Sequence, residues 1–261
     1  MKPKKVAIVS DFHCGHHAGL THPDFDAMPS KNNPPFYALW KSRRRHWDWF
    51  ASEVSQFKPD IVIANGDLID GKGMKSGATE LITADREEQC DMATAILEEM
   101  KAKSNYLTFG TPYHTGDQED MERQISKAIK ADKIGSHDWL DVNGLIFDYR
   151  HHTSSSIVPY GRGTMIARER LWNVLWSGDD YGFPKADVVV RSHVHYFSYI
   201  GGRGWLAMTT PALQGLGTKY GARRMSGTVD FGFITFEVKD KEDWKWQYRL
   251  LQSQKQLPMM A

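Results

Sequence analysis

The residues whose types and spacing suit chemistry are carboxylates and imidazoles that recur in five short segments. Each segment lies at or just after the end of a predicted strand. The five segments are Asp11 with His13, Asp67, His114, His151 with His152, and His193 with His195. Carboxylates and imidazoles bind divalent metal ions and also carry out acid–base steps. A metal-dependent reaction is therefore the first chemistry to consider.

Two of the segments hold a pair of candidate ligands separated by one residue. Asp11 and His13 form one pair, and His193 and His195 form the other. On an extended backbone, residues i and i+2 point to the same side. Each pair is therefore expected to bind one ion together. Asp67 follows a glycine, and a carboxylate held in such a turn can offer one oxygen to each of two ions.

The donor types narrow the choice of metal. Imidazole and carboxylate without thiolate suit manganese, iron, zinc or nickel rather than a structural zinc cage. Cys14 lies next to His13, but its side chain is expected to point away. In known hydrolases two such ions lie about 3.5–4 Å apart and clamp the attacking and leaving oxygens. A water that bridges them becomes a hydroxide nucleophile near neutral pH.

Each segment by itself has a plain structural alternative. Asp-x-His is commonly a polar junction between strand and loop, Gly-Asp is common in turns, and alternating histidines can form the wet face of a sheet. His151 and His152 could be a surface pair. The combination favours a site, because open α/β sheets gather polar side chains at the carboxyl ends of their strands.

The elements that must position these residues follow from the apolar pattern. Buried strands are predicted at residues 6–9, 61–64, 106–109 and 188–190. Helices are predicted at residues 36–57, 85–103, 117–131 and 165–176. Hairpins are predicted at residues 139–149, 196–209 and 231–250. The front half alternates strand and helix and the back half is richer in hairpins. This pattern predicts an α/β fold with layered, mixed sheets.

The composition is that of an ordinary globular chain, with 261 residues, 41% hydrophobic and 25% charged. A formal net charge of +1 gives no global basic field that would indicate a nucleic-acid partner. Two cysteines are too few for a disulfide framework and indicate a reducing compartment. No apolar run suits a signal peptide or a membrane span. We expect a soluble, cytoplasmic protein with one domain over residues 1–261.

The same residues carry a family resemblance over almost the whole chain. The order Asp-x-His, Gly-Asp, a third block ending in histidine, a later histidine and His-x-His resembles the calcineurin-like metallophosphoesterases. Residues 58–70 are especially similar to that family's second block, and residues 231–236 are similar to its late strand. The resemblance implies a layered α/β/β/α sandwich of two mixed sheets flanked by helices. It also implies two divalent transition-metal ions and hydrolysis of a phosphate ester by a metal-bridging hydroxide.

The family's site roles extend to matching positions in this sequence. The resemblance implies that the first ion is held by Asp11, His13 and His195 and that Asp67 bridges the two ions. It implies that the second ion is held by His193 and by one of His151 and His152, with His151 preferred because it comes first after the strand. His152 would then face the phosphate or the surface. His114 matches the histidine that stabilises the transition state or protonates the leaving oxygen.

Two positions depart from the family pattern. Thr111 stands where an asparagine usually binds metal, and Pro112 and Tyr113 come between it and His114. The second ion would then lack one ligand, or Thr111 or a water would supply it. Ser192 replaces the glycine before His-x-His, which is a minor change because serine is small.

The remaining features leave the substrate open. Arg43, Arg44 and Arg45 are expected to form a solvated helix face, with contact to a phosphate backbone as the alternative. Arg223 and Arg224 lie in a glycine-rich loop that could bind substrate phosphate, or that could be an ordinary surface loop.

A phosphodiester is the favoured substrate, with a nucleotide or nucleic acid as candidates. A phosphomonoester or phosphoprotein is the alternative, and a scaffold protein that has lost its chemistry is the competing class. The oligomeric state and the physiological metal are not determined by the sequence.

Overall fold

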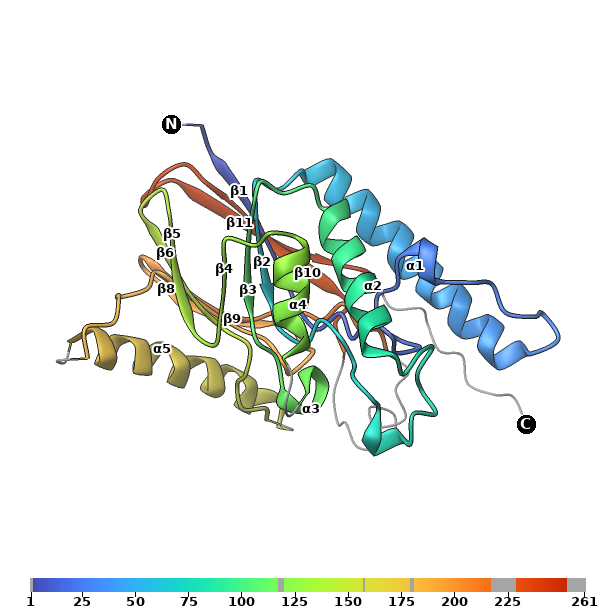
Figure 1. The fold of residues 1–261 in the computed structure, drawn as a ribbon. Coiled ribbons are helices and arrows are strands. Elements are labelled where there is room, and N and C mark those ends of the chain that lie inside the picture. Colours follow the sequence, from blue (N-terminus) through green and yellow to red (C-terminus); the bar gives the residue numbers. More distant parts are fainter. Residues whose placement is uncertain (1, 117–119, 157, 179–180, 217–228, 253–261) are drawn as a thin grey trace.

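The computed structural model of the chain describes residues 2–116, 120–156, 158–178, 181–216 and 229–252. Within these residues two β-sheets lie face to face between layers of helices (Figure 1). The helices are α1 (Pro34–Phe57), α2 (Arg86–Glu99), α3 (Pro112–Thr115), α4 (Met121–Ala128) and α5 (Arg162–Gly178). The predicted α/β fold with two mixed sheets flanked by helices is confirmed.

The first sheet has six strands in the order β11-β10-β1-β2-β3-β4. Its strands are β1 (Lys4–Val9), β2 (Ile61–Asn65), β3 (Ser104–Thr108), β4 (Lys133–Gly135), β10 (Gly232–Val238) and β11 (Trp244–Leu250). Strands β1 to β4 run parallel, whereas β10 pairs antiparallel with both β1 and β11. The carboxyl ends of β1, β2 and β3 therefore meet at one edge of the sheet.

The second sheet has five strands in the order β5-β6-β7-β9-β8. Its strands are β5 (Asp138–Val142), β6 (Leu145–Arg150), β7 (Val188–Arg191), β8 (Ser198–Gly202) and β9 (Trp205–Thr209). Strands β6, β7 and β9 run parallel, and β5 and β8 are antiparallel edges. The predicted Asn143-Gly144 turn is present, with φ values of 53° and 89° that the Asn-Gly pair tolerates well.

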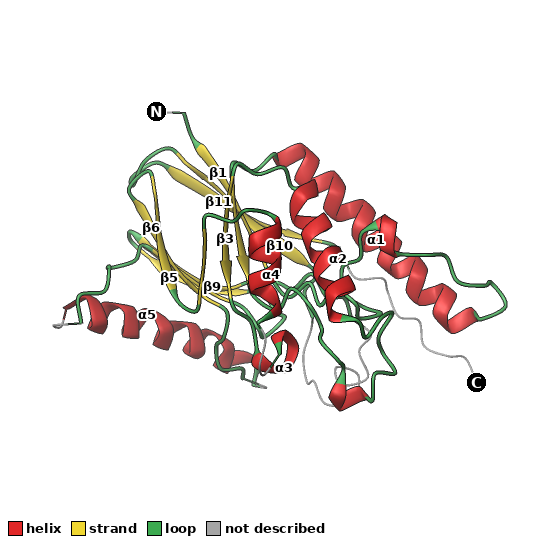
Figure 2. Ribbon diagram, viewed as in Figure 1, coloured by secondary structure: helices red, strands yellow, loops and turns green. Residues whose placement is uncertain are grey.

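Three apolar layers hold the sandwich together. One cluster packs α1, α2 and α4 against the outer face of the first sheet, and includes Phe50, Ile96 and Ile125. A second cluster fills the space between the sheets, and a third packs α5 against the second sheet. Figure 2 shows the strands in the interior with helices on both sides. No helix in the described residues is long and apolar enough to cross a membrane.

Several boundaries differ from the sequence-based expectation. The helix predicted over 85–103 ends at Glu99, and the described part of the helix predicted over 117–131 is α4 alone. The short helix α3 and strand β4 were not anticipated, because four and three residues are too few to show a periodic pattern.

The prediction that Arg43 lies on a solvated helix face is wrong. This side chain is buried, and its Nε and Nη2 donate to Asp26 Oδ1 at 3.0 and 2.8 Å. A partner from the loop before α1 neutralises the guanidinium. The apolar pattern of α1 gives no sign of such a partner.

A buried ion network fixes the second sheet to α5. Arg191, at the end of β7, is fully buried, and its Nη1 donates to Asp148 Oδ1 at 2.7 Å. Its Nε donates to Glu169 Oε2 at 2.8 Å, and Arg150 Nη2 donates to the same oxygen at 2.6 Å. Burial opposes ionisation of Asp148, but Arg191 and His137 outweigh it and lower the pKa of Asp148 to about 2.

Arg191→Ala is expected to lower the free energy of unfolding by about 3 kcal/mol, because it removes the buried cation that two buried carboxylates share and leaves Asp148 with His137 and Glu169 with Arg150. Urea denaturation followed by circular dichroism measures the change. Lys239→Ala, which removes an exposed pair with Asp243, is the control and should leave the midpoint unchanged. An Arg191→Ala midpoint equal to that of the wild type would contradict the structural role of the network.

Candidate metal centre

The predicted ligands meet where the carboxyl ends of the two sheets adjoin. Asp11 and His13 follow β1, Asp67 follows β2, His151 follows β6, and His193 and His195 follow β7. Hydrogen bonds beneath them join the sheets, since Asn65 Nδ2 at the end of β2 donates to Ser192 Oγ after β7 at 2.7 Å. The six residues form two adjacent groups of three.

The first group consists of Asp11, His13 and His195, whose ligand atoms all lie within 4.8 Å of one another. His13 Nε2 lies 3.2 Å from His195 Nε2, and His195 Nε2 lies 3.2 Å from Asp11 Oδ1. Asp11 and His13 are buried, and the side chain of His195 is 16% exposed. Three donor atoms thus converge on one small volume that a cation could share.

The second group consists of Asp67, His151 and His193. His151 Nε2 lies 3.0 Å from Asp67 Oδ2, and His193 Nδ1 lies 3.8 Å from the same oxygen. Gly66 allows this approach, because its φ is 79° and a Cβ there would lie 2.6 Å from the His151 ring. The groups adjoin, since Asp11 Oδ1 lies 4.0 Å from His151 Nε2.

The prediction that the two ligand pairs lie on an extended backbone is wrong. Asp11, His13, Asp67, His193 and His195 all have φ between 46° and 73°, the left-handed region that non-glycine residues seldom occupy. His193 and His195 consequently do not face one ion together. They divide between the two groups, as the family resemblance implied. Such strained backbone is characteristic of functional sites.

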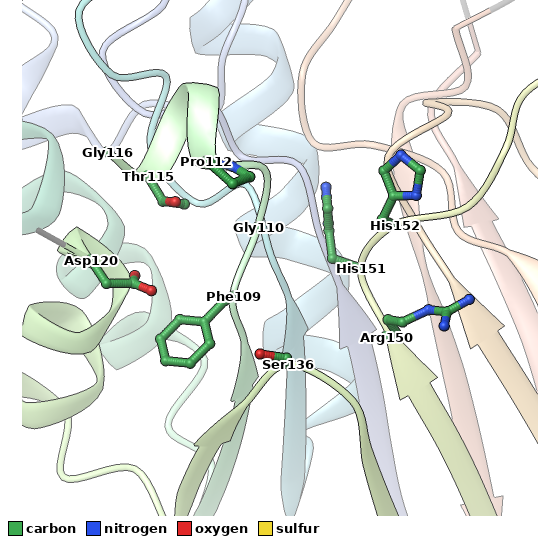
Figure 3. A pocket seen from close by; sticks show the side chains of 10 residues that line it. All are labelled: Phe109, Gly110, Pro112, Thr115, Gly116, Asp120, Ser136, Arg150, His151 and His152. Carbon is green, nitrogen blue, oxygen red and sulfur yellow. The ribbon is translucent and has the colours of Figure 1, made fainter. Parts of the chain in front are cut away.

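Between the two adjacent histidines, the structure places His151 in the second group. Its side chain is 2% exposed, and its Nδ1 lies 2.7 Å from the carbonyl oxygen of Asn65. A carbonyl only accepts hydrogen bonds, so Nδ1 carries the proton and donates, and Nε2 faces the group. His152 is exposed, with its ring centroid 4.8 Å from that of His193. Figure 3 shows the two rings apart from each other, at consecutive positions just after β6.

Thr111 occupies the interior of the second group, although its role was left open by the sequence. Its amide donates to Asp67 Oδ1 at 2.5 Å, and its hydroxyl donates to Asp67 Oδ2 at 3.1 Å. The hydroxyl oxygen also lies 3.2 Å from His193 Nδ1 and 3.5 Å from His151 Nε2. The oxygen is therefore in reach of all three members of the group.

Asp70 belongs to the site but was missed from the sequence. Its Oδ1 lies 3.0 Å from His13 Nδ1, and its backbone carbonyl accepts a hydrogen bond from His114 Nδ1 at 2.9 Å. A carboxylate on Nδ1 fixes the ring of His13 with Nε2 directed at the first group. The signal available was an acid three residues after Asp67, but many exposed turns carry the same spacing.

His114 lies beside the first group. Its ring centroid is 4.6 Å from that of His13, and its side chain is 19% exposed. Because Nδ1 donates to the Asp70 carbonyl, Nε2 is the nitrogen that can exchange a proton with a bound molecule. This placement is compatible with the acid role that the resemblance implied.

The buried carboxylates and imidazoles of the site strongly affect one another's pKa values. Burial opposes ionisation of Asp11, but His195 and His151 outweigh it and lower the pKa of Asp11 to about 2. Burial also opposes the charged form of His151, yet the Asp67 and Asp11 carboxylates raise its pKa to about 10. Burial, with help from His114, lowers the pKa of His13 well below its usual value. The site thus presents charged carboxylates beside a neutral His13 imidazole.

One buried carboxylate oxygen carries the strongest sign of an absent partner. Asp11 Oδ1 is inaccessible and accepts no hydrogen bond in the described part of the chain. Leaving a charged oxygen in this state is costly. Its neighbours are nitrogen atoms of His195 and His151, which are themselves metal ligands by type. The donor set therefore fits a divalent transition-metal ion.

A chain of buried hydrogen bonds supports both groups from below. Ser10 Oγ lies 2.8 Å from Thr210 Oγ1, which lies 2.7 Å from Ser192 Oγ. Asn65 Nδ2 donates to Ser192, and Asn65 Oδ1 accepts from Thr108 Oγ1 at 2.9 Å. These five residues come from the ends of five strands in both sheets. Ser192 is thus part of the network and more than a tolerated replacement of glycine.

A second buried acid near the site was also missed. Glu122, in the first turn of α4, is fully buried and accepts hydrogen bonds from the backbone amides of Leu68 and Gly110. Burial and the nearby Asp67 carboxylate raise its pKa to about 8. Nothing in the sequence around Glu122 indicates burial, because the two amides that bind it belong to other segments of the chain.

A cavity of about 340 Å³ opens beside the second group. Figure 3 shows Arg150, His151 and His152 on one side of it, with Phe109 and Asp120 opposite. Arg150 Nη2 is paired with Glu169, and its remaining N–H groups include a buried Nε with no partner among the described residues. The candidate phosphate contacts Arg223 and Arg224 lie outside the described residues.

No protein-family model and no curated protein match the sequence. Among solved structures, zinc-bound wild-type Vps29 from Entamoeba histolytica is 12% identical, with a TM-score of 0.47 over 94% of this chain and 98% of that chain. Vacuolar protein sorting 29 from Cryptosporidium parvum is 10% identical, with a TM-score of 0.48 over 97% and 100%.

A structure described as a novel archaeal phosphodiesterase is 12% identical, with a TM-score of 0.44 over 94% of this chain and 99% of that chain. At 10–12% identity, these neighbours bear on the fold alone.

Proposed function

We propose that this chain is a dinuclear metal-dependent phosphoesterase. The observation that carries the proposal is the pair of adjacent His/Asp groups, each offering three converging donor atoms at the ends of parallel strands. A single such group is common at protein surfaces, but two groups that are largely buried and linked by an Asp11–His151 contact of 4.0 Å are not. This arrangement suits two ions that act on one substrate.

The ligands of each ion follow the two groups. Asp11, His13 and His195 would hold the first ion, and Asp67, His151 and His193 would hold the second. The hydroxyl of Thr111 would complete the second site in place of the usual asparagine. Asp67 is assigned as the bridge on the family resemblance. Manganese is the first choice, with iron, zinc or nickel as alternatives that the same donors accept.

The charge of the region supports two divalent ions. Asp11, Asp67 and Asp70 are buried around the site, and no lysine or arginine in the described residues forms an ion pair with any of them. Buried carboxylates require compensation by cations or hydrogen bonds. Bound ions would supply that charge, neutralise the substrate's phosphate oxygens and provide the nucleophilic water.

The chain's own residues would orient the substrate and move a proton. The Asp70 carboxylate holds His13 through Nδ1, which fixes the ring that faces the first group. The Asp70 carbonyl holds His114 through Nδ1, which leaves Nε2 to donate a proton to the leaving oxygen. Asp70 thus positions both a ligand and the general acid.

The cavity beside the second group is the candidate place for the organic part of the substrate. Its mixed lining of Arg150, His152, Phe109 and Asp120 suits a group with both polar and planar surface. We therefore favour a phosphodiester, with a nucleotide or nucleic acid as the candidate class. A phosphomonoester or a phosphoprotein is the alternative.

Asp67→Asn and His193→Ala should each abolish turnover, because each removes a ligand of the second ion while the core stays intact. Hydrolysis of bis(p-nitrophenyl) phosphate with added manganese measures the loss, and circular dichroism checks the fold. Asp85→Asn is the control, since it alters only the exposed cap of α2 and should keep full activity. Full activity in either site variant would refute the assignment.

Metal content separates the enzyme from a scaffold protein that has lost its chemistry, an alternative motivated by Thr111. A purified chain that retains about two transition ions supports the enzyme. Fewer than one tightly held ion per chain favours the scaffold.

His114→Ala should lower kcat by about 10²–10⁴-fold for an ester with a poor leaving group, because proton donation is then required. The loss should be much smaller for a nitrophenyl ester, whose leaving oxygen needs no proton. Parallel kinetics on an alkyl and a nitrophenyl ester measure the difference. His22→Ala, whose ring packs on Trp47 away from the site, is the control. Equal losses on both esters would exclude the acid role.

The substrate class is tested by three substrates in parallel with added manganese. These are p-nitrophenyl phosphate, bis(p-nitrophenyl) phosphate and single-stranded DNA. The diester and the DNA are expected to be hydrolysed with the higher kcat/KM values. Preference for the monoester would overturn the choice of a phosphodiester and leave the metal assignment standing.

A further inference from the structure

One carboxylate beside the second group is buried without belonging to it. Glu122 lies in the first turn of α4, where acids are usually exposed, yet its exposed fraction is 0%. Within the described part of the chain no basic side chain forms an ion pair with it. The hydrogen bonds to its two oxygens come from backbone amides instead.

The two amides belong to different loops. Leu68 N donates to Glu122 Oε1 at 3.0 Å, and Gly110 N donates to Glu122 Oε2 at 2.5 Å. Leu68 directly follows Asp67, and Gly110 directly precedes Thr111. One carboxylate therefore joins the loop after β2 to the loop after β3, next to the two residues that share the second group.

The two loops are in close contact at this point. Thr111 N donates to Asp67 Oδ1 at 2.5 Å, and a Cβ on Gly110 would overlap the Asp67 carboxylate. Asp67 also has a left-handed backbone with φ of 53°. Such a conformation persists only where the surroundings determine it strongly. The hydrogen bonds that Glu122 accepts from Leu68 and Gly110 hold the backbone in place on both sides of the Asp67–Thr111 contact.

We propose that Glu122 is a positioning residue that holds Asp67 and Thr111 at the spacing the second metal ion requires. The inference rests on the proposed dinuclear function and deepens it, because it names the residue on which occupancy of the second site depends. Glu122 touches neither ion nor substrate and acts through the two loops. Glu122 accepts no hydrogen bond from the loops of the first group in the described structure, but His13 N and Cys14 N donate to the carbonyl oxygens of Asp67 and Leu68. The first ion should therefore depend on Glu122 less than the second ion does.

The test is a manganese titration of the metal-free full-length chain and its variants. Glu122→Gln retains one accepting oxygen but places an amide group opposite the other N–H, and Glu122→Ala loses both acceptors. The second manganese ion should bind about tenfold more weakly to the first variant and about 100-fold more weakly to the second, the range typical of groups that orient metal ligands. The first ion should lose clearly less affinity than the second, because of its ligands only the bridging Asp67 is held by Glu122.

Glu53→Gln is the matched control, because it removes a carboxylate paired with Arg249 on the outer side of the first sheet. It should leave the affinities of both ions unchanged. A general loss of stability would weaken binding of both ions equally, whereas loss of positioning weakens binding of the second ion more than that of the first. Wild-type affinity for the second ion in both Glu122 variants would overturn the proposal.

Amide hydrogen exchange tests whether Glu122 joins the two loops, independently of metal binding. The amides of Leu68 and Gly110 should be protected in the metal-free wild type and should exchange rapidly in Glu122→Ala. Unchanged protection in that variant would refute the role of Glu122. If the wild type binds fewer than two manganese ions, the dinuclear function fails, and amide exchange alone then decides whether Glu122 joins the loops.

Discussion

Buried negative charge at the carboxyl ends of β1 and β2 is the constraint on which the rest of the site depends. Asp11 and Asp67 lie in the interior, and Asp70 and Glu122 are buried close by. Carboxylates in such a position must be paired or hydrogen bonded, or else they remain protonated. The chain surrounds them with imidazoles and backbone amides rather than with lysine or arginine. These partners compensate the charge only in part, and the arrangement suits an additional cation.

The buried acids beneath α5 are neutralised in a different way. Asp148 and Glu169 are also buried, but Arg191 and Arg150 neutralise them directly. The two sets of buried acids therefore differ in the partners that surround them. Those under α5 are closed ion pairs that hold a helix to a sheet. Those between the sheets face imidazole nitrogens, which are metal ligands by type.

Much of the architecture could be predicted because strong local patterns encode it. Short β-branched runs predicted β1, β2 and β7, and the Asn143-Gly144 turn predicted the β5–β6 hairpin. The grouping of Asp11 with His195 rests on strand order, which the family resemblance supplied. Their backbone geometry could not be predicted, because left-handed φ at Asp11 or His193 arises from contacts between segments far apart in the sequence.

The missed residues share one property. Asp70, Glu122 and Arg43 gain their roles from partners in other loops, so their own neighbours in the sequence carry no sign of them. A pattern of apolar residues identifies which face of a helix is buried, but it does not identify a charged residue that is buried because another loop neutralises it. Such residues are visible only when the loops are seen together.

Five of the proposed ligands have a left-handed backbone, and this conformation lowers the stability of the fold. Glycine or asparagine would adopt those angles at lower cost, so replacing a ligand with either residue relieves strain as it destroys the site. At these five positions the side chains supply donor atoms for a metal ion and the backbone carries the strain.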